Sequence, residues 1–181
     1  SDLLFGGYWE FSPIFPEISE IKAIATGSSH ALFLTSDGTV EARGLSNKYG
    51  ETTLPVGLSD VLTIASGGNH SLALKQNGEV IAWGKNEDGE SNVPVGLTNV
   101  IAIAAGATHS VALKSDGTIV GWGNNEFGQL NIPSDLSNVV SIKAGDYHTV
   151  VLKSDGSVLA WGSNDYGQAS IPDNLLPVKS I

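Results

Sequence analysis

The chain consists of short apolar runs separated by glycine and polar residues. Residues 100–138 read VIAIAAG, HSVALK, SDG, TIVGWG and NNEFGQLNIP in succession. Runs of five or six residues that are rich in Val, Ile and Ala and bounded by turn residues are typical of strands and too short for most helices. We therefore expect three or four short antiparallel strands in this stretch and no helix anywhere in the chain.

Turn residues separate these expected strands. Asp116-Gly117 lies between HSVALK and TIVGWG and predicts a two-residue hairpin of type I′, which requires positive φ at both central positions. Asn125 and Gly128 predict a second turn, because both residue types tolerate turn backbone conformations. Pro133 then closes a short stretch, which belongs at a sheet edge because proline cannot donate to a ladder.

The same pattern recurs about every 40 residues. A histidine marks each repeat, with a glycine three residues before it, and an Asp-Gly or Asn-Gly pair follows in every unit. A fixed period of this length is typical of a repeat protein, and a residue that recurs in every unit is first of all a fold residue. The repeated histidines are His30, His70, His109 and His148, and the repeated tryptophans are Trp83, Trp122 and Trp161.

Small antiparallel sheets repeated around an axis form a β-propeller, in which each blade covers its neighbours. The sequence therefore predicts an all-β fold: β-propeller blades from ~39-residue repeats, four full units with partial blades at both ends, forming part of a ring. The tryptophans are expected to fill the wedges between blades. The expected boundaries, all within one domain, are 1–20 (tail of a preceding blade), 21–60, 61–99, 100–138, 139–177 and 178–181 (start of a further blade).

The four histidines invite a catalytic or metal-binding interpretation, which their periodicity argues against. One histidine per blade at one register is expected to hydrogen-bond the backbone inside its own blade. Equivalent side chains placed around a ring also lie too far apart to share one ion. We expect these residues to be structural, and we predict no catalytic residue, no metal site and no cofactor.

The repeat pattern V-x-x-I-A-x-G-x-x-H-S-x-A-L-K-x-D-G-x-V-x-x-W-G-x-N-x-x-G-Q resembles that of the regulator of chromosome condensation family over about residues 21–178. The short linkers resemble the compact bacterial type, with β-lactamase inhibitory protein II nearest in pattern. The resemblance implies a seven-bladed ring that serves as a rigid platform for binding proteins, and it favours a secreted or cell-surface bacterial protein.

The chain departs from that family pattern because it contains four whole units instead of seven. An open array would leave two unpaired edges, which proteins normally avoid. Three arrangements are compatible with the sequence: a fragment of a longer array, two chains that close one ring by dimerisation, or a small closed propeller.

Composition narrows the function classes. The formal net charge is −10, with 19 acidic and 9 basic residues, and no basic run occurs. Nucleic-acid binding depends on Lys and Arg contacts to phosphates, so we expect no nucleic-acid partner. The longest apolar stretch is far shorter than the ~20 residues of a membrane helix, so we expect no membrane insertion. The chain has no cysteine, which excludes disulfides and thiolate chemistry.

The positions that vary between repeats are the candidates for binding, because repeat platforms place their specificity there. They occur in two loops, the turn after each Trp-Gly position and the pair before each histidine. If both loops emerge on one face, they form an aromatic arc with acids between its members, although the rings could instead cap the outer strands of their own blades. The candidate partner-binding residues are Tyr49, Asp88, Phe127, Asp146, Tyr147 and Tyr166.

We therefore expect a non-catalytic module that binds a protein of unknown identity through loop aromatics, since aromatic anchors are enriched at interface hot spots. A glycan-binding module is the alternative. The family resemblance also implies two less favoured functions, enzyme inhibition of the β-lactamase inhibitory type and nucleotide exchange on a GTPase.

Overall fold

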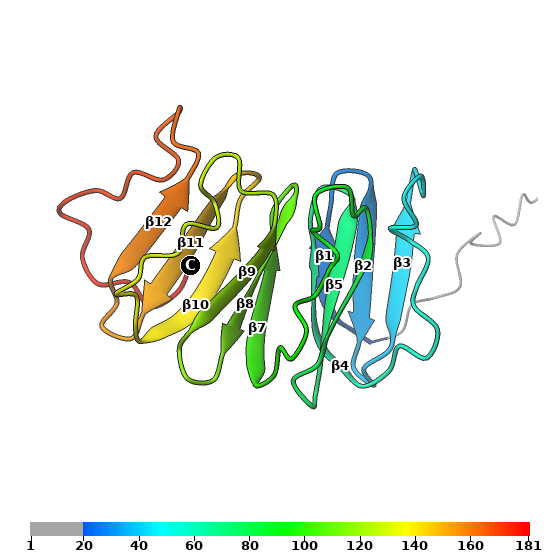
Figure 1. The fold of residues 1–181 in the computed structure, drawn as a ribbon. Coiled ribbons are helices and arrows are strands. Elements are labelled where there is room, and N and C mark those ends of the chain that lie inside the picture. Colours follow the sequence, from blue (N-terminus) through cyan, green and yellow to red (C-terminus); the bar gives the residue numbers. More distant parts are fainter. Residues whose placement is uncertain (1–19) are drawn as a thin grey trace, which may run out of the picture.

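A computed structural model describes residues 20–181, which form four three-stranded antiparallel sheets, each built from three consecutive strands (Figure 1). We call these sheets blades 1 to 4 in chain order. The strands are β1 (Ile21–Thr26), β2 (His30–Thr35), β3 (Val40–Gly44), β4 (Val61–Ser66), β5 (His70–Lys75), β6 (Val80–Gly84), β7 (Val100–Ala105), β8 (His109–Lys114), β9 (Ile119–Gly123), β10 (Val139–Ala144), β11 (His148–Lys153) and β12 (Val158–Gly162). This confirms the all-β, propeller-type prediction, although the four blades do not close a ring. Within residues 20–181 no helix is long and apolar enough to cross a membrane.

Each blade has three strands, and the segment after its Trp-Gly or Arg-Gly position is a loop. In blade 3 this segment contains two turns, closed by the bonds from Gly128 N to Asn125 O (3.1 Å) and from Leu136 N to Pro133 O (3.1 Å). Asn125 also fixes the loop internally, since its Oδ1 accepts from Leu130 N at 2.8 Å. The loop therefore satisfies its polar groups locally and leaves no fourth strand.

The hairpin at Asp116-Gly117 differs from the predicted type I′ turn. Only Gly117 has positive φ, at 81°, and its N–H donates to the carbonyl oxygen of Lys114 at 2.9 Å. Asp116 Oδ1 accepts from Thr118 N (3.0 Å) and Thr118 Oγ1 (2.6 Å). A turn followed by one left-handed glycine thus replaces type I′, because Asp116 gains its hydrogen bonds without entering the left-handed region.

The apolar core lies between blades. Leu32 and Leu34 of blade 1 pack with Ile64, Ala73 and Trp83 of blade 2, and the same arrangement recurs at the next two junctions. Figure 1 shows the sheets side by side with their broad faces toward one another. A sheet of three short strands has too little area to form a core of its own, so each blade depends on its neighbours.

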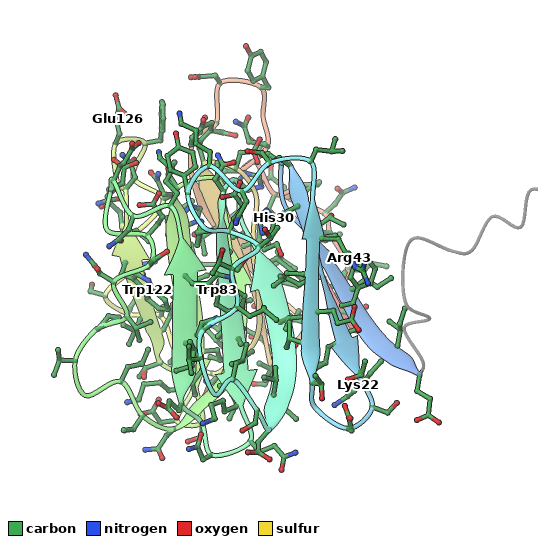
Figure 2. The ribbon with its side chains drawn as sticks, turned by 90° about the vertical axis from the view of Figure 1, so that its right-hand side faces the viewer. Lys22, His30, Arg43, Trp83, Trp122 and Glu126 are labelled. Atoms are coloured by element: carbon green, nitrogen blue, oxygen red, sulfur yellow. The ribbon has the colours of Figure 1, made fainter. Side chains whose placement is uncertain are left out.

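The two ends of the sheets carry different loops. The residues before each histidine and the turn after each third strand meet at one end, because His30 pairs with Gly44 and the equivalent residues pair in the other blades. We call this the loop end. Figure 2 shows Glu126 at the loop end and Lys22 toward the opposite end, where the hairpins and blade-to-blade connections lie. The expected tail of a preceding blade at residues 1–20 lies almost wholly outside the described residues, and residues 178–181 form no strand.

Candidate functional site

The histidine of each blade reaches across to the next blade. His30 Nε2 lies 2.9 Å from Ser71 Oγ, and Ser71 Oγ donates to the carbonyl oxygen of Glu51 at 3.2 Å. The same carbonyl accepts from Trp83 Nε1 at 3.0 Å. The predicted bond to the backbone of its own blade is therefore wrong for the histidine ring: the side chain joins two blades, because the neighbouring hydroxyl is the acceptor within its reach.

This arrangement, which we call the junction motif, occurs three times within residues 20–181. In each copy, the histidine of one blade contacts the Ser or Thr that follows the histidine of the next blade. That hydroxyl and the tryptophan indole of the next blade both donate to one backbone carbonyl, which belongs to the loop of the first blade. The second copy joins His70 Nε2 to Ser110 Oγ (2.9 Å) and Trp122 Nε1 to Glu90 O (2.9 Å); the third joins His109 Nε2 to Thr149 Oγ1 (3.3 Å) and Trp161 Nε1 to Gln129 O (3.0 Å).

Burial suits the histidines to this structural role. It lowers the pKa of both His70 and His109 to about 4, so the imidazoles are neutral at pH 7. Since Ser110 Oγ donates to Glu90 O at 2.8 Å, the proton of the His70–Ser110 contact lies on Nε2. Ser110 is fully buried, so this serine–histidine pair presents no hydroxyl to a substrate.

The glycine before each histidine makes room for its ring. A Cβ on Gly106 would collide with the His109 ring and with the carbonyl oxygen of Gly145 in the next blade. The three-residue spacing from glycine to histidine therefore reflects packing around the imidazole. Among residues 20–181, no group of three His, Asp or Glu side chains lies close enough together to hold a metal ion.

A glutamate or glutamine fixes each loop at the loop end. Glu51 Oε2 accepts from Tyr49 N at 2.8 Å, and Gln129 Oε1 accepts from Phe127 N at 2.9 Å. Glu90 and Gln168 make the same bond to the residue two positions earlier. Our sequence analysis missed these residues as loop anchors, although their constant place after the turn glycine could have indicated the role.

Four of the six predicted binding residues lie together at the loop end of blades 3 and 4. The rings of Phe127 and Tyr147 lie 5.0 Å apart between centroids and are tilted by 50°. Both are exposed by about two fifths, and Tyr166 is 95% exposed. A hollow of about 500 Å³ opens beside them; it is lined by Phe127, Asp146, Tyr147, His148, Ser163, Asp165, Tyr166 and Gln168.

The other two predicted residues are engaged elsewhere. Tyr49 belongs to blade 1, where Lys48 Nζ lies 4.8 Å from its ring centroid and donates to its hydroxyl at 3.0 Å. Asp88 accepts from Asn124 Nδ2 at 3.2 Å and lies 3.8 Å from Lys85 Nζ. Of the aromatic residues in the predicted arc, Phe127, Tyr147 and Tyr166 therefore lie together in blades 3 and 4, whereas Tyr49 lies in blade 1.

Charge is distributed unevenly along the loop end. Lys85 of blade 2 lies within ion-pair distance of Glu87 (3.0 Å), Asp88 and Glu90 (3.9 Å), which offsets the acids there. By contrast, no ion pair to Glu126, Asp146 or Asp165 forms within residues 20–181. The aromatic hollow of blades 3 and 4 is therefore bordered by uncompensated negative charge.

Family membership follows from the repeat itself. The regulator of chromosome condensation (RCC1) repeat matches residues 21–51, 61–90, 100–129 and 139–168, which is most of the chain. The chain belongs to this family. Each matched segment extends from the first strand of a blade to the Glu or Gln that anchors its loop. The RCC1 repeat therefore contains the histidine, the tryptophan position and the shared carbonyl of the junction motif.

Several solved structures of other proteins resemble this one. Prp20p from Saccharomyces cerevisiae, characterised with its binding to Gsp1p and histones, is 26% identical with a TM-score of 0.69, covering 83% of this chain and 47% of Prp20p. Human WBSCR16 is 25% identical with a TM-score of 0.68, covering 87% of this chain and 50% of that one. The ectodomain of the Physcomitrella patens receptor kinase CR4 is 26% identical with a TM-score of 0.65, covering 79% and 39%.

This chain thus spans half or less of the length of these structures. No curated protein sequence matches it.

Proposed function

We propose that this chain is a non-catalytic RCC1-type propeller module that binds a protein partner through the loop end of blades 3 and 4. The observation that carries the proposal is the Phe127–Tyr147 pair beside a hollow with the exposed Tyr166 at its border. Aromatic side chains that remain exposed on rigidly anchored loops are typical anchors of protein interfaces.

The charges around the hollow favour a basic partner. Asp146 and Asp165 border it, Glu126 lies on the neighbouring turn, and none of the three is neutralised within residues 20–181. A Lys or Arg side chain of the partner would gain from the carboxylates and from the aromatic faces together. The net charge of −10 would also steer a basic protein toward the surface.

A peptide array with basic, neutral and acidic sequences tests this proposal. The double variant Phe127→Ala/Tyr147→Ala should weaken binding to basic peptides by at least about tenfold, as expected when interface anchors are truncated. Tyr49→Ala is the matched control, because it removes an aromatic from the equivalent turn of blade 1 and should leave binding unchanged. Equal loss in both variants, or binding that does not depend on peptide charge, would contradict the proposal.

The glycan alternative uses the same hollow, because an exposed tyrosine next to aspartates can also contact a sugar ring and its hydroxyls. A glycan array with the same two variants separates the alternatives. The hollow would be assigned to sugars instead of a basic protein if the chain bound glycans, if Phe127→Ala/Tyr147→Ala abolished that binding, and if added salt left it unchanged.

Two narrower functions rest on resemblance alone. Similarity in repeat pattern to β-lactamase inhibitory protein II suggests enzyme inhibition, and the resemblance to the wider family suggests nucleotide exchange on a small GTPase. An inhibition assay against a β-lactamase panel and a nucleotide-release assay with a small GTPase test these directly. We propose neither as the main function, and we propose no nucleic-acid partner, cofactor or catalytic residue.

A further inference from the structure

The turn after the third strand has the same hydrogen bonds in blades 1, 3 and 4. In each turn the glycine N–H donates to an asparagine carbonyl three residues earlier, at 3.1 or 3.2 Å. The residue before that glycine is aromatic in all three turns, and its N–H donates to the Glu or Gln anchor at 2.8 or 2.9 Å. The three rings therefore project from equivalent backbone positions, and the turns differ in the residue beside them. These aromatic residues are Tyr49, Phe127 and Tyr166.

In blade 1 a lysine of the chain itself contacts this ring. Lys48 Nζ lies 4.8 Å from the centroid of the Tyr49 ring and donates to its hydroxyl at 3.0 Å. An ammonium within about 6 Å of an aromatic centroid is attracted to the negative face of the ring. This turn can therefore hold a positive group against its aromatic side chain.

Blades 3 and 4 carry an acid where blade 1 carries this lysine. Glu126, at the loop end in Figure 2, precedes Phe127, and Asp165 precedes Tyr166. Within residues 20–181 neither acid forms an ion pair, and no lysine or arginine lies over the Phe127 or Tyr166 ring. A positive group at these two rings must therefore come from a partner.

Three aromatic rings line one hollow at this end of blades 3 and 4. The rings of Phe127 and Tyr147 lie 5.0 Å apart between centroids and are inclined to one another by 50°. Tyr166 belongs to the same lining, as do the carboxylates of Asp146 and Asp165. The volume of about 500 Å³ leaves room for a group larger than an ammonium ion. The hollow thus combines aromatic surfaces with negative charge.

This combination favours a methylated ammonium over the other cationic groups of proteins. An unmodified lysine ammonium is strongly hydrated and carries three N–H donors, which aromatic faces satisfy poorly. Methylation removes those donors and weakens the hydration, but it keeps the positive charge. The guanidinium of arginine is flat and stacks on one ring plane. A trimethylammonium group is round, so it can contact two inclined rings at once.

We infer that the hollow of blades 3 and 4 binds a methylated lysine side chain of the protein partner, with its trimethylammonium group against Phe127, Tyr147 and Tyr166. Asp146 and Asp165 supply the opposite charge. This inference rests on the proposed protein-binding function and specifies the group that the partner presents. A choline headgroup carries the same ammonium, but the carboxylates that border the hollow would repel its phosphate.

Calorimetric titration with matched peptides tests this inference. The probe is a short basic peptide with trimethyllysine at its centre; three further peptides carry lysine, arginine or the neutral tert-butyl isostere of trimethyllysine at that position. The trimethyllysine peptide should bind at least about fivefold more tightly than each of the others, because it alone combines charge, weak hydration and methyl contacts. A smaller difference from any of the three would overturn the inference.

A lysine built into the hollow supplies an independent test. Asp165→Lys gives blade 4 the Lys-Tyr pair of blade 1, so the new ammonium should contact Tyr166 and weaken binding of the trimethyllysine peptide by at least about tenfold. Glu87→Lys is the matched control, because it makes the same charge change in the equivalent turn of blade 2, which contributes no residue to the hollow. Equal weakening in both variants would show a general effect of charge and would overturn the inference.

Removal of one ring completes the design. Tyr166→Leu keeps an apolar side chain at a position that is 95% exposed, so the fold does not depend on this ring. The variant should lose most of the preference for trimethyllysine over its neutral isostere, since the isostere gains nothing from a ring face. An unchanged preference would contradict the assigned role of Tyr166 and overturn the inference.

Failure of this inference can be distinguished from failure of the proposed function. If the lysine and trimethyllysine peptides bind equally and Phe127→Ala/Tyr147→Ala weakens both, the protein-binding function stands and the methyllysine assignment falls. If none of the basic peptides binds, both fall. Tighter binding of phosphocholine than of the trimethyllysine peptide would assign the hollow to a choline headgroup and would also overturn the inference.

Discussion

At the scale of single residues, the junction motif explains why histidine, glycine and tryptophan recur together. The imidazole needs a neighbouring hydroxyl, the glycine makes room for the ring, and the indole shares a carbonyl with that hydroxyl. His70 and His109 are fully buried and neutral, so protonation of either imidazole is unfavourable in the folded state. The stability of the fold should therefore depend on pH.

We expect the free energy of unfolding to fall as the pH decreases from 6.5 to 4. Burial lowers the pKa of His70 and His109 from 6.5 to about 4, so across this range the unfolded chain binds more protons than the folded one. The contribution of the neutral histidines to the free energy of unfolding is fully present above pH 6.5. At the acidic limit, the loss of this free energy approaches about 3 kcal/mol per histidine. Urea unfolding at a series of pH values measures this change in the free energy of unfolding.

The His70→Gln/His109→Gln variant is the control for this pH dependence. It should be less stable at pH 7 but should lose most of the slope between pH 6.5 and 4. The turn aspartates act in a different range: hydrogen bonds from Thr118 lower the pKa of Asp116 to about 2, so its contribution is lost only below its unfolded pKa of about 3.9. An unchanged slope in the double variant would show that other groups cause the pH dependence.

At the scale of elements, each blade is a three-stranded sheet whose core is completed by the next blade. The loop before each histidine is the closest point of contact, since Gly68 N donates to Gly106 O at 3.2 Å and Ala107 N donates to Asp146 O at 2.9 Å. Backbone at this proximity leaves no space for an added side chain.

Gly106→Ala should therefore destabilise the protein strongly, by about 3 kcal/mol or more, because the new methyl group meets the His109 ring and a backbone carbonyl that cannot move aside. Gly121→Ala in the same blade is the control. Its Cβ would meet chiefly the mobile end of Leu130, and blades 1, 2 and 4 carry alanine at this position. Chemical unfolding of both variants should show a cost only for Gly106→Ala; comparable losses would contradict this account.

At the scale of the whole molecule, the four blades differ in how much of their surface is covered by neighbouring blades. Within residues 20–181, blades 2 and 3 are covered on both sides, whereas blade 4 is covered only by blade 3. In repeat proteins stability is approximately the sum of the units and their nearest-neighbour interfaces, so it should vary along the array.

Native-state hydrogen exchange should reveal this variation. We expect amides of β11 and β12 to exchange at least about tenfold faster than those of β5 and β8, because opening blade 4 breaks one interface and opening blade 2 breaks two. Uniform protection across the four blades would indicate a single cooperative unit instead of a stepwise array.

Local sequence information was sufficient to predict the strands, the blade spacing and the structural role of the repeated residues. Apolar alternation and turn residues act over a few positions, and four copies reinforce the same prediction. The sequence also placed the binding candidates in the two loops at one end of each blade, since strand pairing brings those loops together. The type of the hairpin turn was not predicted correctly, because Asp116 forms its bonds to Thr118 only in the folded geometry.

The sequence by itself determined the all-β repeat, its period and its family. Only the tertiary structure decided that each histidine bonds to the next blade, about 40 residues away, and that Phe127 meets Tyr147 while Tyr49 is engaged by Lys48. The physical reason is that these contacts join different blades, so they depend on how the sheets pack against one another, which local propensity and periodicity do not specify.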